Sequence, residues 1–172
     1  EALFNGTFTG SFDGAGHSIT FASGKGLTLS ASGAMLFQTV GTDASITNLA
    51  LGTEAAPVTL KLGTLTEKET LCGLLAAETI SNIHVYVNMD ASASLALNFG
   101  GLFGSLANSV TVQGCSANGS ITLDGSAQNE LLNVGGITGI VRTGGTVRLT
   151  DCVNKANIAL KNTKKAASGV GG

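Results

Sequence analysis

The stretch GGLFGSLANSVTVQGCSANGSITL, residues 100–123, contains the pattern that is repeated through this chain of 172 residues. Two glycines and an apolar pair are followed by a turn, a short β-rich segment, a second turn and a third apolar alternation. Three short strands are therefore expected within these 24 residues. Related stretches begin near Met35, Cys72 and Gly135.

The repeat has a register that can be aligned residue by residue. A first strand places Leu36, Leu74, Leu102 and Ile137 in one column, with spacings of 38, 28 and 35 residues. A second strand begins at Ile46, Ile80, Val110 and Val147, and a third at Val58, Val87, Ile121 and Ile158. Strands that recur at this period cannot pair as adjacent hairpins, so we expect them to stack in parallel about 4.8 Å apart.

This register predicts an all-β fold, a right-handed single-stranded parallel β-helix with three strands per coil and about five coils. The handedness follows from the strong right-handed preference of parallel crossover connections. Residues 1–172 form one domain, with approximate coils 1–33, 34–71, 72–99, 100–134 and 135–172. We expect this domain to be a piece of a larger chain, with further coils or domains at its C-terminal end and an open strand edge that favours end-to-end contacts.

A resemblance to known β-helical proteins is carried by two motifs. The string FTGSFDGAGHSI, residues 8–19, resembles the opening of right-handed parallel β-helix regions in large surface proteins of gut-type bacteria. The later GGLFG and GGITG units resemble the GLUG motif of bacterial surface proteins and immunoglobulin A peptidases. The resemblance implies a secreted or cell-surface bacterial protein, and we assign structural roles to Asp13, Gly14, Gly16, His17, Gly100, Gly101, Gly135 and Gly136.

Charge is distributed unevenly along the chain. The formal net charge is −2, which gives no case for a nucleic-acid partner, and no apolar run is long enough for a membrane span. Residues 1–141 contain three basic and ten acidic side chains, whereas residues 142–172 contain six basic and one acidic. The basic set is either a group of charged turns or a contact site for an anion, and its members are Arg142, Arg148, Lys155, Lys161, Lys164 and Lys165.

Catalytic and metal-binding signals are weak. The two histidines, His17 and His84, lie in different elements. His17 follows Asp13 and could hold a metal or relay a proton, but we expect it to stabilise a turn. For His84, we expect no nucleophile or carboxylate partner in the neighbouring columns. Asp90 and Asp124 fall in one column, where a lyase or glycosidase would need paired carboxylates, but Lys61 and Lys161 flank them there. We therefore expect charge compensation, with no catalytic site, no metal and no cofactor.

The cysteines are expected to be structural. Leu51, Val85, Cys115 and Cys152 occupy one inward position in the alignment, so the two cysteines should be apolar fillers on adjacent coils. We predict free thiols there, with Cys72 separate from both.

Two functions remain open. The first is a non-catalytic adhesive or scaffold module of a secreted or cell-surface bacterial protein, with a glycan or a host glycoprotein as partner. The alternative is a β-helix carbohydrate-active enzyme, a lyase or glycosidase, or the non-catalytic part of a surface peptidase. Convergent polar side chains in one groove would favour the enzyme, and flat faces of Ser, Thr and Asn would favour the module.

Overall fold

The computed structural model describes residues 4–22, 27–29, 36–41, 43–62, 69–74, 79–92, 97–106, 109–124, 132–141, 144–161 and 169–171. Within these residues the chain is all-β, with seventeen strands and no helix, so the expected class is confirmed. The strands are β1 (Phe4–Phe8), β2 (Ser11–Ile19), β3 (Leu27–Leu29), β4 (Phe37–Val40), β5 (Ser45–Leu51), β6 (Val58–Leu62), β7 (Glu69–Leu74), β8 (Thr79–Ser92), β9 (Leu97–Leu106), β10 (Val110–Gln113), β11 (Ser116–Asp124), β12 (Leu132–Gly135), β13 (Thr138–Val141), β14 (Val147–Thr150), β15 (Val153–Asn154), β16 (Asn157–Lys161) and β17 (Gly169–Gly171).

Every strand pairing in the described part of the chain is parallel, as the repeat predicts. Ten strands form the largest sheet, β7, β9, β12, β13 and β17 form a second, and β1 pairs with β4. We call the strands that one repeat gives to the largest sheet a rung. Among the described residues there are five rungs: β2 with β3, β5 with β6, β8, β10 with β11, and β14 with β15 and β16.

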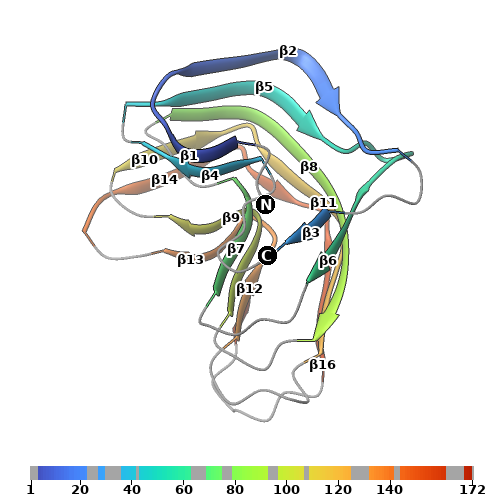
Figure 1. Ribbon diagram of the computed structural model, residues 1–172. Helices are drawn as coiled ribbons and strands as arrows, with labels where there is room; N and C mark the ends of the chain where they lie inside the picture. The colour runs from blue at the N-terminus through green and yellow to red at the C-terminus, as the bar shows by residue number, and fades with distance from the viewer. Residues whose placement is uncertain are drawn as a thin grey trace.

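Figure 1 shows β2, β5, β8, β10 and β14 following one another across the largest sheet. The sheet bends where residues adopt positive φ at equivalent places in successive rungs. Asn48 and Asn82 both have φ 54°, and Asp151 has φ 53°. Asn and Asp tolerate this left-handed conformation better than other non-glycine residues, so the sequence favours the bend there.

The register of the stack differs from the sequence alignment at one step. Ile46 lies beside Ile80, as predicted, but Ile80 lies beside Val112 and not beside Val110. The predicted alignment of β8 with β10 is therefore wrong by two residues. Because side chains alternate with period two, a shift of two leaves every residue on its predicted face of the sheet.

The same shift changes the predicted cysteine column. Val85 lies beside Ala117, and not beside Cys115 as predicted. Cys115 precedes Ser116, which pairs with His84, so Cys115 continues the column of Ile83. Further along, Ile121 pairs with Met89 and not with Val87.

The first-strand column is partly as predicted. Leu36, Leu102 and Ile137 are buried, and the Leu102 amide donates to the Ile137 carbonyl at 3.3 Å. Leu74, however, pairs with Phe103, because the register between β7 and β9 shifts by one residue just before Leu74 in the chain. The predicted pairing of Leu74 with Leu102 is therefore wrong, and the side chain of Leu74 lies outside the described residues.

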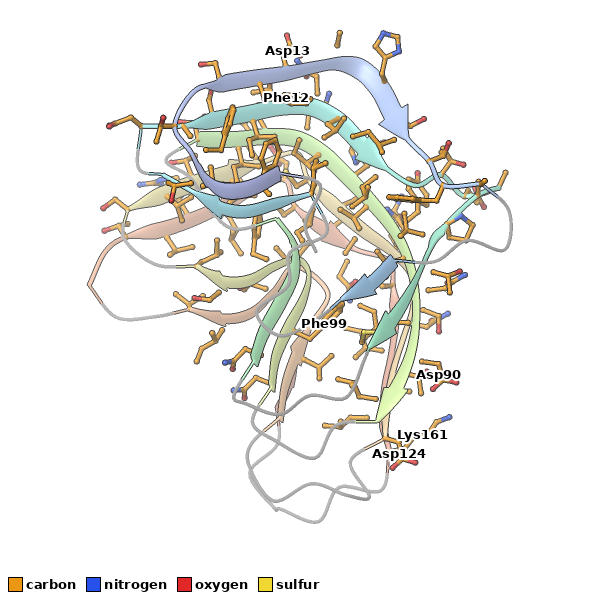
Figure 2. The ribbon with its side chains drawn as sticks, viewed as in Figure 1. Phe12, Asp13, Asp90, Phe99, Asp124 and Lys161 are labelled. Carbon is orange, nitrogen blue, oxygen red and sulfur yellow. The ribbon has the colours of Figure 1, made fainter. Side chains whose placement is uncertain are left out.

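The core lies between the sheets and contains aliphatic side chains from all the central rungs. Phe37, Phe99 and Phe103 are among its largest fully buried side chains. Figure 2 shows Phe12 and Phe99 pointing into this space.

The paired glycines of the repeat lie where the second sheet is most crowded. A Cβ on Gly101 would collide with the carbonyl oxygen of Gly136, and one on Gly100 would collide with that of Phe103. A Cβ on Gly135 would likewise collide with the carbonyl of Thr138. Because glycine has no side chain, the backbones can approach one another closely here.

Candidate functional site

A groove of about 450 Å³ crosses the outer face of the largest sheet. It spans four successive rungs, because Glu54 and Pro57 precede β6, Tyr86 lies on β8, Asn118 lies on β11 and Lys155 follows β15. The complete lining among the described residues is Glu54, Pro57, Tyr86, Asn88, Asn118, Gly119 and Lys155. We call this the Tyr86 groove, after the single tyrosine of the chain.

One wall of the groove is a tight turn that presents Glu54. The amide of Thr53 donates to the Ala56 carbonyl at 3.0 Å, and the Ala56 amide lies 3.1 Å from the Thr53 carbonyl and 3.0 Å from the Thr53 hydroxyl. Pro57 follows the turn and fixes the backbone at the entry to β6. The exposed Glu54 carboxylate is therefore carried on a well-defined loop.

The floor of the groove consists of aromatic and amide side chains. Tyr86 and Asn88 alternate with the buried Val85, Val87 and Met89, so they project outward from β8. Asn118 Nδ2 donates to the Val85 carbonyl at 3.1 Å and to Ser116 Oγ at 3.0 Å. These two bonds fix the plane of the Asn118 amide beside Tyr86.

The far wall is Lys155. Its backbone amide donates to the Ala117 carbonyl at 2.8 Å, which holds it next to Asn118. The Ala156 amide donates to Asn154 Oδ1 at 3.0 Å, so the turn that carries Lys155 is also closed by a side chain. Lys155 itself is exposed.

The predicted basic set does not form one cluster among the described residues. Arg148 lies on β14, Lys155 lies in the groove and Lys161 lies on β16, and all three are exposed. Lys161 pairs in register with Asp124 of the neighbouring strand, so its charge has an acidic neighbour. Arg142, Lys164 and Lys165 lie outside the described residues.

Asp90 and Asp124 do not share a column, which corrects the sequence prediction. Asp90 lies beside Thr122, whereas Asp124 lies beside Ser92 on one side and Lys161 on the other. Figure 2 shows Asp90 and the adjacent Asp124 and Lys161 pointing away from the core. The two-residue shift between β8 and β11 therefore makes Asp90 and Asp124 diagonal neighbours on the outer face instead of direct ones.

His84 has a partner that the sequence alignment missed. Its Nδ1 lies 2.8 Å from Ser116 Oγ, and its Nε2 lies 2.9 Å from Asn82 Oδ1. Asn82 Nδ2 in turn donates to Asn48 Oδ1 at 3.0 Å, so the Asn82 oxygen faces the imidazole and accepts a hydrogen bond from its Nε2–H group. Nδ1 is then the acceptor for the Ser116 hydroxyl, and the expectation that no nucleophile lies next to His84 is wrong.

Hydrogen bonds thus link a row of polar side chains: Ser116, His84, Asn82, Asn48 and Asp13. The row ends at Asp13, whose side chain Figure 2 shows on the outer side of β2. Asp13 Oδ1 accepts from the Ala15 amide at 2.9 Å and from Asn48 Nδ2 at 3.0 Å. These hydrogen bonds, the backbone bond first, lower the pKa of Asp13 below its ordinary value.

The predicted structural residues around Asp13 lie in a bulge. Two extra residues separate Asp13, beside Thr47, from His17, beside Leu49. Gly14 is buried, and a Cβ there would lie 2.5 Å from the Asn48 carbonyl oxygen, while Gly16 has φ 76°. His17 is exposed on β2.

Cys115 and Cys152 are free thiols, as predicted, and they lie next to each other on adjacent rungs. Cys115 is buried, and burial raises its pKa to about 11, with a smaller contribution from Cys152. Cys152 is half-buried, and its Sγ lies 3.4 Å from the Thr150 carbonyl. Cys72 has a described backbone in β7, and its side chain lies outside the described residues.

The groove was missed from the sequence because its residues come from four rungs, and the predicted register between β8 and β11, on the third and fourth rungs of the sheet, was wrong. One available signal was the isolated Tyr86 in an outward position, followed two residues later by Asn88. Among the described residues, no three His, Cys, Asp or Glu side chains are grouped as metal ligands, and no helix has the length and hydrophobicity of a membrane crossing. Comparison with protein-family models, with curated proteins and with solved structures found no match.

Proposed function

We propose that this chain is a right-handed parallel β-helix, with three strands per coil, that serves as a non-catalytic carbohydrate-binding module of a secreted or cell-surface bacterial protein. The parallel pairing of strands about one repeat apart supports the β-helix, and parallel crossovers supply the handedness. The motif at residues 8–19 and the GGLFG unit support the bacterial surface assignment by resemblance.

The observation that carries the binding function is the Tyr86 groove. It combines an aromatic ring with the fixed amide of Asn118 and the exposed amide of Asn88 on one face, and sugars present both apolar C–H faces and hydroxyls. Asn88 offers donors and an acceptor to the hydroxyls, Asn118 offers its Oδ1 as an acceptor because both of its N–H groups are already donated, and Tyr86 offers an apolar surface to a pyranose ring. The partner class is a glycan, free or on a host glycoprotein.

The test is binding of the purified domain to a glycan array, followed by calorimetry on the best ligand. Tyr86→Ala should weaken binding by about tenfold or more, because one aromatic contact is worth roughly 1.4 kcal/mol or above. Tyr86→Phe should retain most of the affinity because the ring remains. Thr111→Ala, an exposed substitution on β10 outside the groove, is the matched control. Equal binding by the wild type and Tyr86→Ala would refute the site.

A carbohydrate-active enzyme is the second candidate, and two observations favour it. The Tyr86 groove gathers several polar side chains, which is the feature expected of an enzyme. Ser116, His84 and Asn82 place a hydroxyl, a base and an orienting group in hydrogen-bond order, which is the connectivity of a nucleophilic site. The same side chains also belong to the row that ends at Asp13, which gives them a structural role.

A panel of polysaccharide lyase, glycosidase and sugar-ester substrates separates the two functions. The non-catalytic proposal expects no turnover by the wild type. Turnover that is lost in Ser116→Ala or His84→Ala and kept in Thr111→Ala would establish the enzyme instead.

A further inference from the structure

The Tyr86 groove has opposite charges at its two ends. Glu54 lies on the turn before β6, and Lys155 lies after β15, so two rungs separate the segments that carry them. With neighbouring strands about 4.8 Å apart, the two segments are roughly 14 Å apart. The uncharged Tyr86, Asn88 and Asn118 lie between them.

We propose that the groove binds a glycan that lies across the strands and carries one carboxylate, on a terminal acidic sugar held at Lys155. The neutral sugar at the other end would present its hydroxyls to Glu54. This inference rests on the proposed carbohydrate-binding function and adds the ligand class and its direction in the groove.

Lys155 is the basic residue best placed for this role among those described. It lines the groove, and its backbone is held by the bond to the Ala117 carbonyl, one residue from Asn118. Lys161 is not in the groove lining and has Asp124 beside it in register. Lys161 is therefore a matched control, since it is an exposed lysine of the same rung.

Glu54 discriminates between acidic ligands by the number of carboxylates that they carry. A carboxylate accepts hydrogen bonds from sugar hydroxyls but repels a second carboxylate nearby. A polymer with an acid on every sugar would place one of its charges against Glu54, whereas a glycan with one terminal acid would not. The groove should thus favour the singly acidic glycan over both the neutral and the fully acidic one.

The experiment measures binding of three probes by calorimetry at low and high salt. The probes are a trisaccharide that ends in sialic acid, the same glycan without that sugar, and an oligogalacturonate. We expect the sialylated probe to bind about tenfold more tightly than the neutral one at low salt, and the advantage to shrink at high salt. Lys155→Gln should remove the advantage, Lys161→Gln should leave it intact, and Glu54→Gln should strengthen binding of the oligogalacturonate.

The outcomes separate this inference from the function on which it rests. Equal binding of neutral and sialylated probes, both weakened by Tyr86→Ala, would overturn the inference and leave the proposed function standing. An acidic preference that survives Lys155→Gln would also overturn it. Failure of all three probes and of the whole glycan array would refute the proposed function and this inference together.

Discussion

The third and fifth rungs of the largest sheet contain the same inward column, but they bury it to different extents. Ile80 and Val112 are 0% exposed, whereas Leu149, next in that column, is 44% exposed. β8 has parallel partners on both sides, while β14 pairs with β10 alone among the described strands. An inward position in a stacked sheet is therefore buried only when another rung covers it.

One exposed apolar side chain of the second sheet follows the same rule. Val141 on β13, a strand of the last repeat, is 51% exposed although it lies beside Leu106, which is 0% exposed. Val153 on β15 is 46% exposed for another reason, because it pairs with Ser116 and so lies on the outward face. The sequence predicted which side chains of a strand point inward. How much an inward side chain contributes to stability depends on the number of neighbouring rungs that cover it.

Replacing the same column residue in the two rungs should give the largest contrast. Ile80→Ala should lower the free energy of unfolding by about 3 kcal/mol, because it opens a cavity in a closed core. Leu149→Ala should cost about 1 kcal/mol, because that side chain is already partly in water. Urea titration followed by circular dichroism measures both, and equal losses would contradict a rung-dependent core.

The two neighbouring cysteines extend the comparison to reactivity. The raised pKa of Cys115, about 11 against an ordinary 9.0, reduces its thiolate population roughly hundredfold at neutral pH. Alkylation of the native protein should therefore label the half-buried Cys152 well before Cys115, as followed by mass spectrometry. Because burial is the main cause of the shift, Cys115 should remain slow in Cys152→Ser. Fast labelling of Cys115 in that variant would contradict the assignment, and a Cys115–Cys152 disulfide would contradict the free thiols.

Two glycines with positive φ give a smaller contrast. Gly119, with φ 104°, lies on the fourth rung, and a Cβ there would collide with the Val87 carbonyl of the third rung. Gly144, with φ 120°, is open, because an added Cβ would have no described atom within 4 Å apart from its chain neighbours. Gly119→Ala should cost about 2 kcal/mol or more from strain plus the collision, and Gly144→Ala about 1 kcal/mol from strain alone. Thermal denaturation compares the two, and the reverse order would show that neighbouring rungs do not limit the space.

Much of the fold was predictable because it depends on local alternation. Apolar side chains recur with period two along the segments that contain Ile46, Ile80 and Val112. This alternation alone indicates strands and an inward face. The spacing of the GGLFG and GGITG units indicates parallel pairing one repeat apart. These features are confirmed in the described residues.

The register between β8 and β10 was not predictable from the same signal. A shift from Val110 to Val112 exchanges one apolar residue for another and keeps every face unchanged, so the pattern does not distinguish the two alignments. The candidate site depends on that shift. It makes Asp90 and Asp124 diagonal neighbours and places Ser116 beside His84, which the alignment could not show.

Asp13 provides the last and smallest test, at the first rung. Its lowered pKa means that the ionised carboxylate stabilises the folded state. That contribution is present above the unfolded pKa of about 4 and is lost as the pH falls through the lower folded value. Asp13→Asn retains an oxygen acceptor for the Ala15 amide, so it should melt slightly below the wild type at neutral pH, and the difference should shrink below about pH 4.

The matched variant Asp13→Ala removes the acceptor as well as the charge. It should melt below Asp13→Asn at every pH, because the Ala15 amide and Asn48 Nδ2 then lose their shared partner. Calorimetric melts from neutral to strongly acidic pH measure all three proteins. If the difference in melting temperature between the wild type and Asp13→Asn stays constant down to strongly acidic pH, folding does not favour the ionised form of Asp13. A small effect is expected because Asp13 is fully exposed, so water competes for its hydrogen bonds even while Asn48 and Ala15 hold it in place.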